Sequence, residues 1–351
     1  MKNYNLLLFM LLLCSWSAQA TILTVSNNGG TPAQYTDLQV AHNSANSGDT
    51  LFVHASGNNY GNVNISKQLT IIGEGYTGPS FTGLIDISFT NNSASGSSII
   101  GFFISGTIFA NGSGLQIDAI SIERCYLYYN SYTGSTPPVA TPKIYSKGNN
   151  WIIRHCIAYE TELCFGYGVA SGWIIANNIL DNRDINYSSI DTRMIDQIIN
   201  STVENNVIAN VDFIFYYAYN INIKNNIFYQ ALNIEYNPQV TNSIVNNLSN
   251  NAALGNVNGN IQNTNPFFIN NYVDARLVNV PALNLQLQAS SLARGAGVGG
   301  TDMGIHGGAT PMPYPYDGKA AKPNIEQLII QNPVVGQGQF LKFQIEAKTR
   351  D

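Results

Sequence analysis

The sequence predicts an all-β solenoid built from short coils, and three observations support this. A phrase of one apolar residue, any residue, two asparagines and a second apolar residue recurs, beginning at Ile175, Val203, Ile223 and Ile244. Degenerate copies begin at Ile122 and Ile153, and the six copies start 31, 22, 28, 20 and 21 residues apart. A period near 21 residues is typical of a solenoid. Charged residues form only 11% of the chain, whereas Gly, Asn, Ser and Tyr are abundant, which favours short strands and tight turns over helices.

Residues 1–20 are predicted to form a secretory signal peptide. Lys2 precedes the apolar run Leu6–Leu13, and the small-residue sequence Ala18–Ala20 is a suitable cleavage site. The apolar run is too short to span a bilayer, and we expect no transmembrane segment after cleavage. The mature chain would then begin at Thr21 and be secreted, in the periplasm or on the outer cell surface.

The first coils are predicted to follow a short cap. Residues 34–45 are the one stretch suited to a helix, and a solenoid needs a cap because its first coil otherwise exposes the core. The phrases GDTLFV (48–53), NVNISKQLTIIGEG (62–75) and SIIGFFISG (98–106) follow. They resemble the opening coils of secreted right-handed parallel β-helix proteins of the pectate-lyase-like superfamily. This resemblance covers about residues 35–308 and implies a right-handed single-stranded parallel β-helix over residues 21–308.

The second asparagine of each pair is predicted to form a ladder inside a bend between two strands. Asn tolerates left-handed backbone, and its amide can bond neighbouring backbone groups. The stacked residues would be Asn178, Asn206, Asn226 and Asn247. Cys125 and Cys156 occupy the same position in earlier coils, and we expect small buried side chains there, with a disulfide between them as the alternative. With Cys164, an odd number of cysteines follows the signal peptide, which argues against a disulfide framework.

The C-terminal part is predicted to close the solenoid and to continue beyond it. Residues 252–287 would form the last coils, and the phrase ARGAGVGGTDMGIHGG (293–308) resembles the closing segment of many secreted bacterial β-helix proteins. The proline-rich residues 309–323 are predicted to be a linker. Residues 324–351 contain two predicted strands, Ile325–Ile330 and Phe340–Ala347, which we expect to form a hairpin that folds back on the helix or begins a further domain.

Two coils are longer than the rest, and their extra residues predict a groove. The coil from Ile122 has its surplus at residues 130–142, and the coil from Ile175 has its surplus at about residues 181–189. Both surpluses follow the same bend, so the two loops would emerge on one face with the short coil from Ile153 between them. The alternative is that both insertions have no function.

Charged residues gather near this predicted groove. They are Asp181, Arg183, Asp184, Asp191, Arg193 and Asp196, with Glu160, Glu162 and Asp212 on neighbouring coils. Carboxylates close together raise one another's pKa, which can create a general acid, or they can hold a hard cation such as Ca²⁺. The alternative is that Asp and Arg pairs solvate a long loop. No cofactor is required, and no metal ligands are assigned.

One phrase in this region resembles pectin methylesterases. VDFIF (211–215) matches a segment of that family in which the aspartate is the nucleophile, which implies this role for Asp212. The resemblance also implies that Asp191, 21 residues earlier, is the acid. The chain departs from the family pattern at Ile190 and Tyr216, which replace a Gln and a Gly, and no segment supplies the partner arginine. A lyase would instead need a cationic side chain, for which Arg193, Arg183 and Lys224 are the candidates nearby.

Aromatic residues suggest a third kind of site. Tyr126, Tyr128, Tyr129 and Tyr132, and residues 213–219, are dense beside the predicted groove. Aromatic faces stack on sugar rings, so we select Tyr128, Tyr129 and Tyr216, with Asp196, as candidate ligand-binding residues. The alternative is aromatic stacking inside the solenoid.

The sequence therefore leaves three functional hypotheses. The leading one is non-catalytic glycan binding or surface interaction. The second is a polysaccharide-active enzyme, a lyase before an esterase, and the third is a structural or adhesion module. A polysaccharide or a cell-surface glycan is the expected partner, and we expect a monomer. The net charge of −5 leaves no basic patch, so nucleic acid is not an expected partner.

Overall fold

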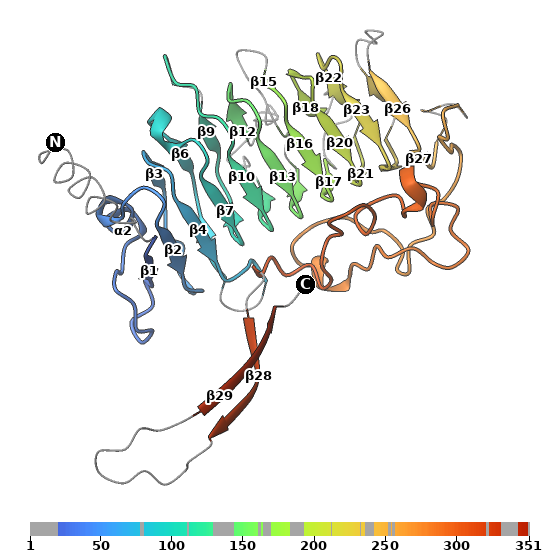
Figure 1. Ribbon diagram of the computed structural model, residues 1–351. Coiled ribbons are helices and arrows are strands. Elements are labelled where there is room, and N and C mark those ends of the chain that lie inside the picture. The colour runs from blue at the N-terminus through green and yellow to red at the C-terminus, as the bar shows by residue number, and fades with distance from the viewer. Residues whose placement is uncertain are drawn as a thin grey trace, which may run out of the picture.

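The chain winds into a parallel β-helix, which confirms the predicted fold class (Figure 1). The computed structural model describes residues 20–77, 81–110, 112–128, 144–160, 163, 170–182, 193–211, 213–231, 233–235, 242–251, 254, 257–320, 323–330 and 343–349. Neighbouring strands within the helix run parallel, coil upon coil. Each backbone strand is therefore paired with its equivalent in the next coil, which satisfies the backbone polar groups along the axis.

Two long sheets form two faces of the helix. The ten-stranded sheet contains β1 (Ile22–Val25), β2 (Thr50–Val53), β4 (Thr70–Gly73), β7 (Ser98–Ile100), β10 (Ser121–Glu123), β13 (Ile152–Arg154), β16 (Ile174–Ala176), β20 (Thr202–Glu204), β23 (Asn222–Lys224) and β26 (Ser243–Val245). The eight-stranded sheet contains β5 (Gly83–Leu84), β8 (Phe103–Ile104), β11 (Tyr126–Tyr128), β14 (Ile157–Tyr159), β17 (Ile179–Asp181), β21 (Val207–Ala209), β24 (Ile227–Tyr229) and β27 (Leu248–Ser249).

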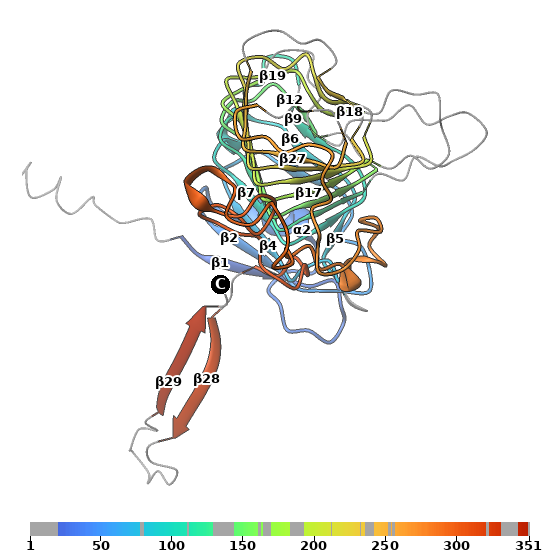
Figure 2. The same cartoon turned by 90° about the vertical axis from the view of Figure 1, so that its right-hand side faces the viewer.

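Shorter sheets form the remaining face. They are the sheet of β3 (Val63–Ile65), β6 (Ile87–Phe89), β9 (Ile108–Ala110) and β12 (Ile144–Ser146), the pair β15 (Ala170–Ser171) and β19 (Ile198–Ile199), and the sheet of β18 (Arg193–Asp196), β22 (Phe213–Tyr216) and β25 (Asn233–Glu235). Figure 2 looks along the stacked coils and shows these faces around a common interior.

The register of the ten-stranded sheet follows the repeated phrase. Ile122 pairs with Ile153, and the same row continues through Ile175, Val203, Ile223 and Ile244. Their side chains point into the helix, where most are fully buried. The period read from the sequence therefore sets the strand pairing, including across the two long coils.

The two residues at each bend have different conformations and different partners. The first of the two bend residues, which is the third residue of the phrase, has a left-handed backbone. Its φ is 53° at Arg124, 56° at His155, 54° at Asn177, 55° at Asn205, 58° at Asn225 and 50° at Asn246. The second residue points inward and bonds the next coil. The Oδ1 atom of Asn206 accepts from the backbone N–H (2.9 Å) and the Nδ2 group (3.0 Å) of Asn178.

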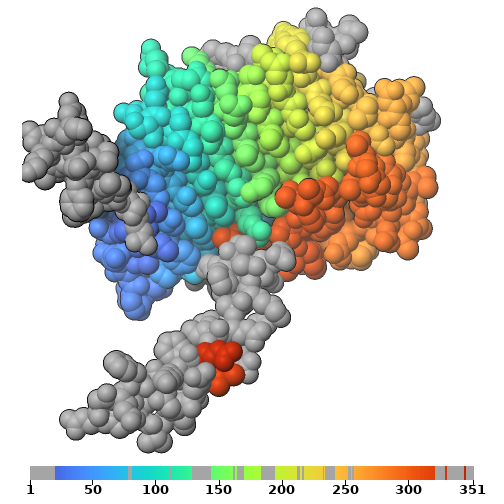
Figure 3. Space-filling model, viewed as in Figure 1, coloured from blue at the N-terminus to red at the C-terminus, as the bar shows by residue number. Residues whose placement is uncertain are grey.

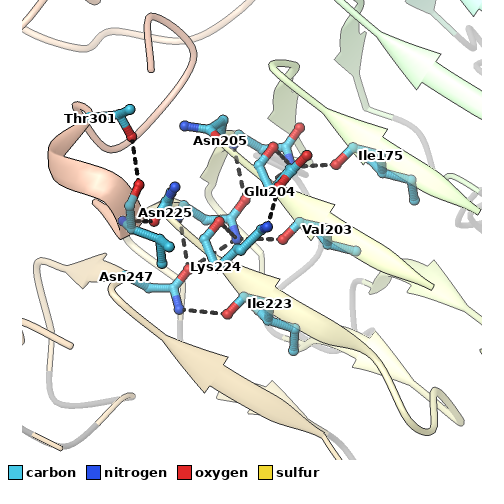
Figure 4. A network of polar contacts seen from close by, with 12 residues as sticks. Ile175, Val203, Glu204, Asn205, Ile223, Lys224, Asn225, Asn247 and Thr301 are labelled. Carbon is cyan, nitrogen blue, oxygen red and sulfur yellow. Dashed lines mark hydrogen bonds and ion pairs between the residues drawn. The ribbon is translucent and has the colours of Figure 1, made fainter. Parts of the chain in front are cut away.

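The same inner bonds recur along the axis (Figure 4). Asn206 donates to Asn226, Asn226 to Asn247, and Asn247 to Asn260, each from backbone N–H and side-chain Nδ2. Asn260 was not selected from the sequence. All these amides are buried, so each stacked asparagine satisfies polar groups that water cannot reach.

The two cysteines occupy the same row before the asparagines. The Cys156 N–H donates to Asn178 Oδ1 (2.9 Å), and the Cys125 N–H lies 3.5 Å from Cys156 Sγ. Both are fully buried and free, so the alternative of a disulfide between them is wrong. Burial raises the pKa of the Cys156 thiol well above its usual value, which suits a packing residue and not a nucleophile.

A helix covers the first coil, within the predicted residues 34–45. Helix α2 (Leu38–Ser44) begins at Asp37, whose Oδ1 accepts from the Val40 N–H (2.8 Å). Its buried residues Leu38 and Ala41 close the end of the interior core. Short 3₁₀ turns occur at Asn92–Ala94 (η1), Val280–Ala282 (η2) and Val298–Gly300 (η3).

The chain stops coiling earlier than predicted. Ile261 still pairs with Leu248, but residues 262–320, which we call the return segment, run back along the outside of the helix towards its N-terminal coils (Figures 1 and 3). Prediction of coils up to residue 287 was therefore wrong. The linker prediction was also wrong for residues 309–320, because Met312 and Tyr316 are buried (3% exposed each).

The return segment is held by the outward residues of successive bends, in reverse chain order. Asn246 donates to Ala296 O, Asn225 accepts from the Val298 N–H, Asn205 donates to Gly304 O, Asn177 donates to Ile305 O, His155 bonds Thr310 O, and Arg124 donates to Lys319 O. The two asparagines of each phrase thus have different hydrogen-bond partners. One bonds the coil above, and the other bonds the return segment.

A second apolar core lies between the return segment and the outer face of the eight-stranded sheet. From the sheet it includes Ile157, Ile179, Val207, Ile227 and Leu248, and from the return segment Phe268, Leu283, Leu285, Met303 and Ile305. Gly304 has φ of +82°, and a Cβ there would lie 2.7 Å from the Cδ1 atom of Ile227. Close docking on the sheet therefore requires a glycine at position 304 of the glycine-rich phrase.

The C-terminal strands β28 (Pro323–Ile330) and β29 (Phe343–Thr349) pair antiparallel. In Figures 1 and 2 this hairpin extends away from the helix rather than folding back on it. Among the described residues, no helix is both long enough and apolar enough to cross a membrane.

Candidate functional site

Three of the seven predicted catalytic and ligand-binding residues lie outside the part of the chain that the structure describes. This is so for Asp191, Asp212 and Tyr129, and for residues 130–142 and 183–189. Arg193 and Tyr216 are described only as members of the strands β18 and β22. The predicted groove and its catalytic residues therefore stay predictions.

The predicted stacking of Asp191 and Asp212 stays a prediction, and the structure gives the register of the strands beside them. Arg193 pairs with Phe213, and Asp196 pairs with Tyr216, an offset of 20 residues. Asp191 and Asp212 are 21 residues apart. The one-coil spacing that suggested an esterase is therefore one residue longer than the coil spacing of the adjacent strands.

Of the charged residues expected to form one cluster, those that the structure describes belong to two different faces. Asp196 lies in the sheet of β18 and is buried (1% exposed). Asp181 and Glu160 lie instead at the eight-stranded sheet, where the Glu160 N–H donates to Asp181 O (2.9 Å). The sequence could not separate them because the two faces are joined by the same long coil.

A cleft of about 390 Å³ opens on the outer face of the eight-stranded sheet, towards its N-terminal half. Its aromatic lining comes from three successive coils: Phe103 from β8, Tyr126 and Tyr128 from β11, and Tyr159 from β14. Glu160, Arg276, Leu277 and Val278 complete the lining. Strands of neighbouring coils lie about 4.8 Å apart, so the strand register places these rings in two adjacent stacked pairs, Phe103 with Tyr126 and Tyr128 with Tyr159.

The rings form a floor and a rim. Phe103 stacks on Tyr126 with centroids 5.7 Å apart, and Tyr128 stacks on Tyr159 with centroids 6.0 Å apart. Tyr126 and Tyr159 are almost fully buried and form the floor, whereas Phe103 and Tyr128 are partly exposed. Tyr128, which the sequence selected, is therefore a ring that a ligand can reach.

The polar groups of the cleft come from both sides, the Tyr hydroxyls and Glu160 from the coils and Arg276 from the return segment. Arg276 Nε donates to Tyr159 Oη (3.0 Å) and lies 3.4 Å from Asp274 Oδ2. The bond to Tyr159 raises the pKa of Arg276, so its guanidinium stays charged. Burial is the main cause that raises the pKa of Tyr128, with the Glu160 carboxylate second, so its hydroxyl stays protonated at neutral pH.

Sequence analysis missed the return-segment residues of this cleft. Arg276 is 117 residues from its partner Tyr159, and no repeat links them. The aromatic lining had a visible signal, because Tyr126 and Tyr128 alternate about the inward-facing Leu127. Among the residues that the structure describes, no three His, Cys, Asp or Glu side chains are grouped to hold a metal ion. Ca²⁺ binding stays a prediction.

Similarity to known proteins is found among solved structures. No protein-family model and no curated protein matches the chain. Among solved structures, the chain is similar to the crystal structure of pectate lyase Pel9A, with 12% sequence identity and a TM-score of 0.39, over 82% of this chain and 96% of that one. A likeness of this extent carries no information on activity.

Proposed function

We propose that this protein binds a carbohydrate in the cleft of the eight-stranded sheet, without catalysis. The observation that carries the proposal is the gathering in one cleft of two stacked pairs of aromatic rings from three successive coils, Phe103 with Tyr126 and Tyr128 with Tyr159. Its volume of about 390 Å³ lies in the usual range for ligand sites. The predicted signal peptide would place this function outside the cytoplasm.

The chemistry of the lining suits a sugar. Apolar ring faces match the C–H faces of a pyranose, and the Tyr hydroxyls, Glu160 and Arg276 match its hydroxyl groups. Tyrosine presents a large contact area at a low cost in conformational entropy. A neutral or a charged glycan could use these groups.

The test is binding to a glycan array, followed by titration of any glycan retained, with Tyr128→Ala and a matched control. The control is Phe109→Ala, because Phe109 is also a partly exposed aromatic residue (41% exposed), paired with Tyr145 on another face. We expect Tyr128→Ala to weaken binding by about fivefold to tenfold, since one lost aromatic stacking contact is worth about 1 to 1.4 kcal/mol, and Phe109→Ala to bind as the unchanged protein does. Absence of binding to every glycan, or equal binding by both variants, would contradict the proposal.

A further inference from the structure

Asp181 lies beside the cleft but does not line it. In the eight-stranded sheet, Tyr128 pairs with Tyr159, and Tyr159 pairs with Asp181, so the three occupy one row on the outer face. Asp181 is fully buried (0% exposed) beneath the return segment. A carboxylate at the outward position that tyrosine fills in the two preceding coils requires an explanation.

The carboxylate is bonded to the part of the return segment that forms the cleft wall. Asp181 Oδ2 accepts from Tyr272 Oη (2.7 Å) and from the Ala275 N–H (2.8 Å). Asp181 Oδ1 accepts from Asn210 Nδ2 (2.7 Å), which belongs to the next coil of the helix. A buried carboxylate is tolerated only when it is well hydrogen-bonded, so these donors and this acceptor depend on one another.

Both backbone polar groups of Ala275 are hydrogen-bonded to side chains of the helix. Asp181 accepts from its N–H, and its carbonyl accepts from Tyr126 Oη (2.9 Å), a ring in the cleft floor. Ala275 itself is fully buried. The next residue, Arg276, then enters the cleft and bonds Tyr159.

We propose that Asp181 is a positioning residue of the binding cleft. Its carboxylate fixes residues 272–275 against the sheet, and this sets where Arg276 and the wall residues Leu277 and Val278 stand. The inference rests on the proposed carbohydrate binding for its functional part. Its structural part, the fixing of the wall, can be tested without any ligand.

The first test is amide hydrogen exchange, followed by mass spectrometry, on Asp181→Asn in the full chain. Asparagine is close in size but neutral, and its Nδ2 group donates where a carboxylate oxygen accepted. We expect exchange in peptides covering residues 270–280 to become at least tenfold faster, with little change in the coils. The matched control is Asp49→Asn at the N-terminal end, because Asp49 is also a buried carboxylate (3% exposed) that accepts from the Thr21 and Asn46 N–H groups. Unchanged exchange at 270–280 in Asp181→Asn would overturn the inference.

Tyr272→Phe provides a second variant if Asp181→Asn does not fold. It removes one donor to Asp181 Oδ2 and keeps the ring that contacts Tyr229 with centroids 5.1 Å apart. We expect faster exchange in the same peptides, by a smaller factor. Exchange as slow as in the unchanged protein would again count against the role of Asp181.

The second test is a double-mutant cycle on binding of the glycan identified by the array. Asp181→Asn and Arg276→Ala should each weaken binding about tenfold, and the double variant should be little weaker than Arg276→Ala alone, because both changes act through one side chain. A merely structural role of Asp181 would give additive losses, which would overturn the positioning role. If the unchanged protein binds no glycan, carbohydrate binding fails, while hydrogen exchange still decides whether Asp181 fixes the wall.

Discussion

The molecule has two apolar cores that form in different ways. The inner core lies inside the coils and is built from one row of residues after another, such as Ile122, Leu127 and Ile144 in a single coil. The outer core lies between the eight-stranded sheet and the return segment, and its two halves come from residues far apart in the chain. The packing of the inner core therefore repeats from coil to coil, whereas the outer core forms only when the return segment docks on the eight-stranded sheet.

The outer face also changes along its length, and this change creates the cleft. Its outward row runs from Phe103 and Tyr126 to Ile157, Ile179 and then further aliphatic residues. Where the row is aliphatic, the return segment covers it completely. Where it is aromatic, the cover is partial and leaves the cleft. The same strand geometry therefore builds a closed core or an open cleft, according to the side chains it presents.

The largest expected effect is loss of an inner asparagine. In Asn226→Ala, the backbone N–H and the Nδ2 group of Asn206 lose their acceptor, and the Val203 and Lys224 carbonyls lose a donor. We expect the free energy of unfolding to fall by about 3 kcal/mol, measured by urea denaturation, because these buried groups stay unsatisfied. The adjacent Asn225→Gly, which keeps the left-handed backbone and loses only the outer bonds, should cost about 1 kcal/mol. Equal losses of unfolding free energy in the two variants would refute the different roles of the inner and outer asparagines.

The next effect concerns docking of the return segment. Gly304→Val should lower the free energy of unfolding by about 2 kcal/mol more than Gly299→Val, because both glycines have positive φ but only Gly304 touches the sheet. We also expect limited proteolysis to cut the return segment of Gly304→Val while the coils stay intact. Should the two variants be equally stable and equally resistant, the outer core would not depend on this contact.

Acid should weaken the outer core through His306. Burial lowers the pKa of His306 from 6.5 to about 4, and its Nε2 atom lies 2.7 Å from Tyr316 Oη. Between these two pKa values the unfolded chain binds a proton that the folded chain does not, so stability falls as pH falls from about 6.5 to about 4. At pH 5.5 this loss should be about 1 kcal/mol. Denaturation curves of His306→Gln should lack this part of the pH dependence, and identical pH dependence in both proteins would contradict it.

The smallest effect is expected at the open end of the outer core. Tyr159→Phe removes the acceptor of Arg276 Nε but keeps the ring that stacks on Tyr128. Because Arg276 is partly exposed, water can replace the hydroxyl, and the free energy of unfolding should fall by only about 0.5 kcal/mol. A loss as large as that of Asn226→Ala in the same denaturation assay would mean that the cleft is part of the stabilising core.

The sequence predicted the inner core well and the outer core poorly, for a physical reason. Inward residues repeat with the coil, so Ile153, Ile175 and Val203 could be aligned by period alone. The outer partner of Asn205 is Gly304, and no period relates them. The sequence assigned the second asparagine of each phrase to the inner ladder, but no pattern identified the partner of the first. Asn260 was missed because Gly259 replaces the first asparagine of its phrase.

The return segment has a mechanical consequence. Although the hairpin of β28 and β29 comes last in the chain, the polypeptide leaves the body near the first coils, where Arg124 holds Lys319 O and Gly318 packs on Tyr76. Tension applied at the hairpin therefore enters the molecule at its N-terminal coils. It would peel the return segment away one bend at a time, from Arg124 towards Asn246, before any coil is pulled apart. The hydrogen bonds between the bends and the return segment would therefore break before those between the coils.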